Sequence, residues 1–150
     1  MASRRELYRI IDANFNRSRE GLRVCEDIAR FILSSPALSK DLKSLRHSIS
    51  SIIKSSRGFS VLLLESRDTG CDVGRQPDFS IEVPRQKAKD IFSANIERVK
   101  ESLRVLEEFL KLTDLKSSAK MQRIRFKAYE IEKKAVIRLS GPKYSGKGGL

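Results

Sequence analysis

The chain has 150 residues, the size of one ordinary domain, with 39% hydrophobic and 33% charged residues. It contains no apolar run that could span a bilayer, no signal-peptide pattern at its start, and two cysteines without metal-ligand or disulfide spacing. Lysine and arginine number 31 against 19 aspartates and glutamates, a net charge of +12 that favours anionic partners. We therefore expect a cytoplasmic protein without a membrane span. Its anionic partners could be nucleic acid, an acidic membrane face or phosphorylated small molecules, and the charge alone does not choose among them.

The first part of the chain predicts two long helices. Apolar residues recur at helical spacing over residues 5–33 and again over residues 38–55. Pro36 and Gly58 interrupt the pattern after each of them. The apolar run at residues 59–66 fits either a strand or a buried helix, and we favour a short helix because its surroundings are helical.

The second part begins with a loop and ends with two more helices. Residues 67–75 contain two glycines, two aspartates and two arginines, and an extended connection over residues 76–85 follows. Helical spacing then returns over residues 86–112 and 116–139. Glycine and proline end the last helix, and we expect residues 141–150 to form a flexible tail.

An internal repeat organises these elements. Residues 13–26 and 94–107 align without a gap, and eight of the fourteen positions are identical. The repeat continues into the second helix of each half, where Leu45-Arg46 corresponds to Ile124-Arg125. A repeated helical hairpin predicts an all-α four-helix bundle with a pseudo-twofold axis. The expected domain covers residues 1–140, with halves at about 5–55 and 86–139 and the loop region 59–85 between them.

The repeated helices carry polar residues close to their apolar face. On a helical wheel Asn14 points inward, as does Asn95 by repetition, and a buried amide without a hydrogen bond costs on the order of 1–3 kcal/mol. Arg17 and Arg98 follow one turn later, with Glu20 further round. Two interpretations stay open for these residues: contacts to a ligand, or helix cross-links and pairs along one helix.

Two arginines of the second and fourth helices also lie at apolar positions. Arg46 falls among leucines and isoleucines, and Arg125 lies at the border of the equivalent face. A buried guanidinium requires a carboxylate or a phosphate. We expect either an ion pair to Glu20 or Glu101, or direct contact with a ligand.

The loop offers the best metal ligands in the sequence. Asp68 and Asp72 are carboxylates, and Mg²⁺ commonly takes one or two protein carboxylates together with water and substrate phosphates. Arg67 and Arg75 flank them and suit phosphate oxygens. The alternative is a solvated turn, in which aspartate and glycine are common.

Taken together, these segments resemble a small family of thiamine-biosynthesis domains. The family comprises monofunctional hydroxymethylpyrimidine-phosphate kinases, which are often fused in front of thiamine-phosphate synthase. The resemblance is carried by residues 9–17, 20–27, 42–47, 67–74, 94–98 and 101–108.

This resemblance implies ATP-dependent phosphorylation of 4-amino-5-hydroxymethyl-2-methylpyrimidine phosphate to the diphosphate, with Mg²⁺ accompanying ATP. It does not assign individual side chains, so the following roles are our hypothesis. Asp68 and Asp72 bind magnesium and are catalytic, and Glu20 and Glu101 support the site. Substrate and phosphates are bound by Asn14, Arg17, Arg46, Arg67, Asn95, Arg98 and Arg125.

Two other functions fit parts of the sequence. A basic helical module that binds RNA or DNA agrees with the charge, although the chain has only ten aromatic residues and mixes glutamate with arginine in its repeat. A non-catalytic domain that partners thiamine-phosphate synthase is the other alternative. A homo-oligomer is compatible with either the kinase or these alternatives.

Overall fold

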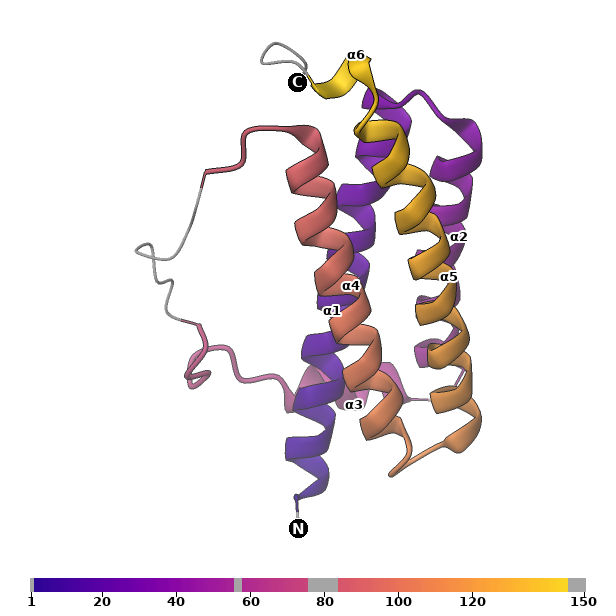
Figure 1. Ribbon diagram of the computed structural model, residues 1–150. Coiled ribbons are helices and arrows are strands. Elements are labelled where there is room, and N and C mark those ends of the chain that lie inside the picture. The colour runs from indigo at the N-terminus through magenta and orange to yellow at the C-terminus, as the bar shows by residue number, and fades with distance from the viewer. Residues whose placement is uncertain (1, 56–57, 76–83, 146–150) are drawn as a thin grey trace.

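The computed structural model describes residues 2–55, 58–75 and 84–145, and the regular secondary structure of this part of the chain is helical, without strands. Four long helices lie side by side as a bundle, and a short helix lies near one end of it (Figure 1). The elements are α1 (Arg4–Asp27), the π-helical turn η1 (Ile28–Ile32), α2 (Pro36–Lys54), α3 (Phe59–Ser66), α4 (Ala88–Leu110), α5 (Leu115–Leu139) and α6 (Pro142–Ser145). The all-α class and the four-helix bundle predicted from the sequence are confirmed.

The bundle consists of the two expected hairpins, α1–α2 and α4–α5. Helix α1 packs against both α2 and α4, and α5 packs against both α4 and α2. Helices α1 and α4, which carry the two repeat copies, run antiparallel through the bundle (Figure 1). The described residues that follow α3, which include the Asp/Gly loop, lie outside the bundle (Figure 1).

Polar caps fix where the first two helices begin. Ser3 and Glu6 form a capping box, in which the Glu6 amide donates to Ser3 Oγ at 3.2 Å and the Ser3 amide donates to the Glu6 carboxylate. The hydrogen bonds from Ser3 lower the pKa of Glu6. Ser35 caps α2, and Pro36 occupies its first turn, where the missing amide hydrogen is not needed.

The prediction of one continuous α-helix over residues 5–33 is wrong in its last turn. The α-helix ends at Asp27, and a single π-helical turn covers Ile28–Ile32. This wider turn keeps Ala29 and Leu33 buried, so the apolar spacing alone did not reveal it. Ser34 then adopts a positive φ of 49°, which turns the chain towards α2.

The ambiguous segment at residues 59–66 is a helix, as favoured from the sequence. Gly58 has a φ of 79° and starts α3, a conformation that costs little without a Cβ. Leu63 is 2% exposed, and the Phe59 ring packs edge-on against Tyr8 with centroids 5.4 Å apart. Helix α3 thereby closes the end of the α1–α2 hairpin.

The end of the chain contains one element beyond the predicted four helices. Residues Pro142–Ser145 form α6, and Tyr144 packs against the core. The rest of the predicted tail, residues 146–150, lies outside the described residues, as does the 76–83 part of the predicted connection. Among the described residues, no helix is long and apolar enough to cross a membrane.

The two repeat helices approach each other closely at Gly21. A Cβ at this position would lie 2.8 Å from Val99 Cγ2 and 3.0 Å from the Asn95 carbonyl oxygen. The following leucines of the two copies, Leu22 and Leu103, are both fully buried. The absence of a side chain at Gly21 therefore allows the close approach of α1 and α4 at this point.

Candidate functional site

Two equivalent ion pairs join the helices within each hairpin. Arg46 Nε donates to Glu26 Oε2 at 3.1 Å, and Arg125 Nε donates to Glu107 Oε2 at 3.0 Å. Both glutamates are nearly buried, and the two arginine side chains are 17% and 12% exposed. The four residues occupy matching positions of the repeat, so the pseudo-twofold symmetry extends to these side chains.

Arg46 and Arg125 therefore form ion pairs, which is one of the two interpretations predicted from the sequence. The expected partners, Glu20 and Glu101, were wrong, because the carboxylates that bind them are Glu26 and Glu107. The repeat contains both pairs of glutamates, and helical spacing alone did not distinguish which pair faces the neighbouring helix.

The repeated asparagines are satisfied within their own helices. Asn14 is 5% exposed, as its inward position predicted, and its Nδ2 donates to the Ile10 carbonyl at 2.9 Å. Asn95 Nδ2 donates to the Ile91 carbonyl at 2.8 Å in the same way. These bonds explain how a buried amide is accommodated and leave the Asn14 carbonyl oxygen to accept from a donor such as Arg17, 3.5 Å away.

The neighbouring arginines Arg17 and Arg98 have a different environment. Both are exposed on the outer surface of the α1 and α4 helices. Neither forms an ion pair with a carboxylate in the described ranges. Two exposed guanidinium groups without a carboxylate partner are available to an anionic ligand.

The Asp/Gly loop is fastened to α1 by one strong contact. Arg67 Nε and Nη2 donate to the two oxygens of Asp12 at 2.7 and 2.8 Å, a bidentate pair across 55 residues of chain. Asp12 is only 6% exposed. Its hydrogen bonds and charge raise the pKa of Arg67, so the guanidinium stays protonated. Asp12 was absent from the site predicted from the sequence.

A cavity of about 300 Å³ lies between this loop and the outer face of α1. Its lining residues are Arg9, Asp12, Ala13, Asn16, Glu20, Arg67, Asp68, Thr69 and Asp72. The structure thus brings together four of the predicted site residues, Glu20, Arg67, Asp68 and Asp72. The other predicted residues do not line this cavity: Asn14, Arg17, Arg46, Asn95, Arg98, Glu101 and Arg125.

The two loop aspartates stabilise turns, and Asp68 Oδ2 also lies 3.9 Å from Arg5 Nη2. Asp68 Oδ1 accepts from the Cys71 amide at 3.2 Å, and Asp72 Oδ1 accepts from the Gly74 amide at 2.8 Å. No group of three or more metal-binding side chains is assembled among the described residues. Magnesium binding by Asp68 and Asp72 therefore stays a prediction, which would require water and substrate phosphates to complete the coordination.

The sequence did contain a signal for the cavity residues that were missed. Arg9, Asp12 and Asn16 project from α1 into the cavity. The corresponding positions of the second repeat copy hold different residues, namely Asp90, Ser93 and Glu97. Three of the five α1 residues that line the cavity thus differ between the copies, whereas Ala13 and Glu20 are identical in both.

Comparisons with known proteins place the chain in a family. It matches the ThiD2 family over residues 9–134. It is 38% identical over 131 residues to a thiamine-phosphate synthase of Synechocystis, covering 87% of this chain and 36% of that protein. It is 35% identical over 140 residues to a thiamine-phosphate synthase of Rhodopirellula baltica, covering 93% of this chain and 37% of that protein. No solved structure gives a significant match.

The chain spans little more than a third of the curated relatives it matches. The names of these relatives agree with the thiamine-biosynthesis context predicted from the sequence motifs. The matched segment contains both repeat copies, the loop and the cavity. The chain belongs to the ThiD2 family.

Proposed function

We propose that this protein is an ATP-dependent kinase that converts hydroxymethylpyrimidine phosphate to the diphosphate in thiamine biosynthesis. The observation that carries the proposal is the bidentate contact between Asp12 and Arg67, which holds the Asp68–Asp72 loop over a cavity on α1. The cavity volume of about 300 Å³ suits a small phosphorylated molecule.

The chemistry of this reaction asks for positioning and charge neutralisation. The acceptor is already a phosphate anion, so the site needs no strong general base. Arg9 and Arg67 lie on the cavity wall and neutralise phosphate oxygens. Asp68 and Asp72 would hold Mg²⁺, which supplies further positive charge to the phosphates.

The cavity also offers groups that recognise an aminopyrimidine. Asn16 Nδ2 donates to the Asp12 backbone carbonyl at 2.9 Å, which fixes the amide and leaves its carbonyl oxygen free. This oxygen and the Glu20 carboxylate accept hydrogen bonds from an exocyclic amino group. In this proposal Arg17, which follows Asn16, binds phosphate at the edge of the cavity, whereas Arg46 and Arg125 belong to the scaffold.

The test is a coupled assay of ADP release with purified protein, Mg-ATP and the pyrimidine monophosphate. We expect turnover with the monophosphate and none with the unphosphorylated pyrimidine, which lacks the acceptor phosphate. Absence of turnover with both compounds would overturn the kinase proposal.

A loop variant tests the assigned site within the same assay. Asp68→Asn removes a carboxylate charge from the cavity and should lower turnover by about 100-fold or more while the helical circular dichroism is unchanged. Asp41→Asn removes an exposed carboxylate from α2 and should leave turnover unaffected. Full activity of Asp68→Asn would contradict the metal-binding role of the loop.

A non-catalytic partner domain is the second candidate. The observation in its favour is that the chain covers only 36% of a relative named thiamine-phosphate synthase. Co-purification with a thiamine-phosphate synthase, together with no ADP release in the kinase assay, would favour this function.

A further inference from the structure

A second groove runs between α2 and α5, and neither helix contributes to the loop cavity. Two adjoining cavities of about 440 and 260 Å³ form it and share Ser44, Ser48, Ile124 and Lys127. Figure 1 shows α2 and α5 on the side of the bundle away from the projecting loop segment. The groove is therefore separate from the proposed kinase site.

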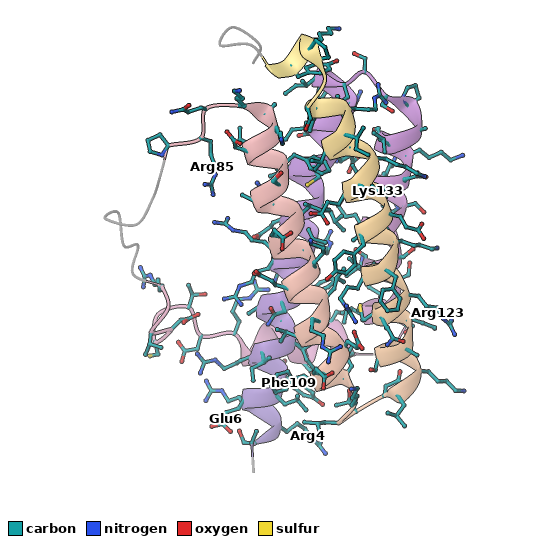
Figure 2. All side chains as sticks on the ribbon, viewed as in Figure 1. Arg4, Glu6, Arg85, Phe109, Arg123 and Lys133 are labelled. Carbon is teal, nitrogen blue, oxygen red and sulfur yellow. The ribbon has the colours of Figure 1, made fainter. Side chains whose placement is uncertain are left out.

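The two walls of the groove differ in chemistry. Helix α5 contributes the cations Lys120, Arg123 and Lys127 to the larger cavity, while α2 contributes a row of serines, and no carboxylate lines this part. Arg123 projects outward from α5 (Figure 2). Arg123 and Lys127 form no ion pair with any carboxylate that the structure describes. Unpaired cations opposite hydroxyl donors match the oxygens of a phosphate chain.

The dimensions of the groove indicate an elongated ligand. The lining residues on α5 extend from Lys120 to Lys134, a rise of about 21 Å at 1.5 Å per residue. The smaller cavity also contains the carboxylates Asp41 and Glu130, so the cations without a nearby carboxylate lie in the larger one. The apolar floor is almost covered, since Ile52 and Ile124 are 8% and 6% exposed. Binding of a helix in a groove depends on exposed apolar anchors, and this groove offers few of them. A partner helix is therefore a poor candidate for its ligand.

Aromatic side chains stand on the same helix as the basic row. Phe126 is 53% exposed and Tyr129 is 46% exposed. Phe126 keeps this exposure although the guanidinium carbon of Arg125 lies 5.0 Å from its ring centroid. Neither ring lines the groove: Tyr129 faces α4, where Lys100 Nζ lies 4.6 Å from its ring centroid, whereas Phe126 lies three residues after Arg123 and is its neighbour on the exposed surface of α5. An exposed ring beside a cation is a combination by which proteins bind single-stranded nucleic acid.

We propose that the α2–α5 groove binds single-stranded nucleic acid. Arg123, Lys127 and Lys120 contact successive phosphates, and the hydroxyls of Ser44 and Ser48 donate to phosphate oxygens. The ring of Phe126 stacks against a base. This binding does not depend on the kinase activity, because it uses a different pair of helices.

The test is fluorescence anisotropy of a labelled oligouridine RNA titrated with the full-length protein at low and moderate salt. We expect binding that weakens steeply with salt, because each neutralised phosphate releases counterions. The double variant Arg123→Gln/Lys127→Gln should weaken binding about 10-fold or more at low salt and reduce the log–log salt slope by about 1.4. Phe126→Leu should weaken binding by about 5-fold or more through lost stacking.

A matched control removes the same two charges elsewhere. The double variant Arg4→Gln/Lys89→Gln removes two positive charges at the starts of α1 and α4. It should weaken RNA binding by less than about 2-fold, because it lowers only the net charge of the protein. Both double variants should retain their helical circular dichroism and, if the kinase proposal holds, their turnover.

Three results would overturn the proposal. They are absence of RNA binding at low salt, equal weakening in the two double variants, and displacement of the RNA by inorganic triphosphate at the same phosphate concentration. The last result would assign the groove to small anions in place of a nucleic acid.

Discussion

The two hairpins of this protein share a repeat but differ in what lies outside it. In both halves an arginine of the second helix pairs with the last glutamate of the repeat, at 3.1 Å for Arg46–Glu26 and 3.0 Å for Arg125–Glu107. Only the first copy is followed by the Asp/Gly loop, whose Arg67 binds Asp12. The comparison shows that repeated residues such as Arg46 and Glu26 build the scaffold, while three of the five α1 residues that line the cavity, Arg9, Asp12 and Asn16, differ between the halves.

The exposed arginines are the exception to this rule. Arg17 and Arg98 are identical in the two copies but form no ion pair with a described carboxylate. Their retention in both halves has no explanation in the scaffold. The presence of arginine in both copies is consistent with the proposed phosphate binding by Arg17. Arg98 is the equivalent residue in the second half, which has no Asp/Gly loop after it.

The largest effect is expected at the diverged position that fastens the loop. Asp12→Asn removes the charge that holds Arg67 in its bidentate geometry, and kinase turnover should fall by about 10- to 100-fold, as for other lost supporting contacts. The matched change in the second copy, Ser93→Ala, should leave turnover within about 2-fold of the unmodified protein because Ser93 does not line the loop cavity.

The same coupled assay measures both variants, with urea unfolding as the control for folding. Asp12→Asn should lower the free energy of unfolding by about 1 kcal/mol only, because Arg67 is 44% exposed and solvent screens the pair. Equal turnover of Asp12→Asn and Ser93→Ala would contradict a role in the active site for Asp12 that its counterpart Ser93 lacks.

The next effect concerns the duplicated ion pairs. Glu26→Gln and Glu107→Gln each leave a largely buried guanidinium without its counter-charge, and each should lower the free energy of unfolding by about 2 kcal/mol. Urea unfolding at neutral pH measures both values. A difference of more than about 1 kcal/mol between them would show that the two halves depend unequally on this pair.

A smaller effect is expected at the contact between the repeat helices. Gly21→Ala places a Cβ 2.8 Å from Val99 Cγ2 and 3.0 Å from a backbone oxygen, and the net loss of stability should be about 1–2 kcal/mol after the gain in helix propensity. The equivalent residue, Ser102, is buried and bonds only its own helix through the Val99 carbonyl at 3.0 Å.

Thermal and urea unfolding of Gly21→Ala and Ser102→Ala test this asymmetry. Ser102→Ala should cost less than about 1 kcal/mol, because it removes one local hydrogen bond. If Gly21→Ala were stabilising, the packing of α1 against α4 would not require a residue without a side chain at position 21.

The smallest effect is a pH dependence confined to the first half. Burial, assisted by the charge of Glu132, raises the pKa of Cys25 from 9.0 to about 12, whereas the second copy has Leu106 at this position. Since the folded state retains the thiol proton that the unfolded chain releases, stability should fall as pH rises from about 9 towards 12. Between pH 8 and pH 10 the loss from this group should be on the order of 1 kcal/mol.

The measurement compares the pH dependence of urea unfolding in the unmodified protein and in Cys25→Ala. Cys25→Ala is destabilised at all pH values by the cavity it creates. Its free energy of unfolding should nevertheless lack the decrease between pH 8 and pH 10 that the thiol causes in the unmodified protein. Identical slopes would show that the thiol of Cys25 does not stay protonated in the folded protein.

The sequence predicted the helices and the hairpin repeat because both depend on spacing along the chain. Apolar residues at helical intervals identified the four long helices within a few residues of their observed ends, and the short helix Phe59–Ser66 followed from its surroundings. The inward position of Asn14 was confirmed for the same reason. The π-helical turn at Ile28–Ile32 was missed because its wider spacing buries the same residues.

The contacts of the site depend on pairs that are distant in sequence. Asp12 and Arg67 are 55 residues apart, and nothing in either segment alone indicates the other. Similarly, buried Lys100 contacts Glu132 of the next helix at 2.7 Å as well as Glu97 of its own helix. Helical spacing predicts which face a residue occupies, but the choice between two carboxylates on adjacent faces requires the packing angle of the helices.

The close contact of α1 with α4 has a consequence during synthesis. Gly21 packs against Val99, and the Cys25 thiol lies 3.8 Å from the Phe92 carbonyl oxygen, 67 residues later in the chain. A ribosome that adds about 5–20 residues per second needs roughly 4–17 s to extend the chain from the end of α1 to the end of α4. During that interval the apolar face of α1 lacks its main cover, so the nascent first half is an expected binding site for chaperones.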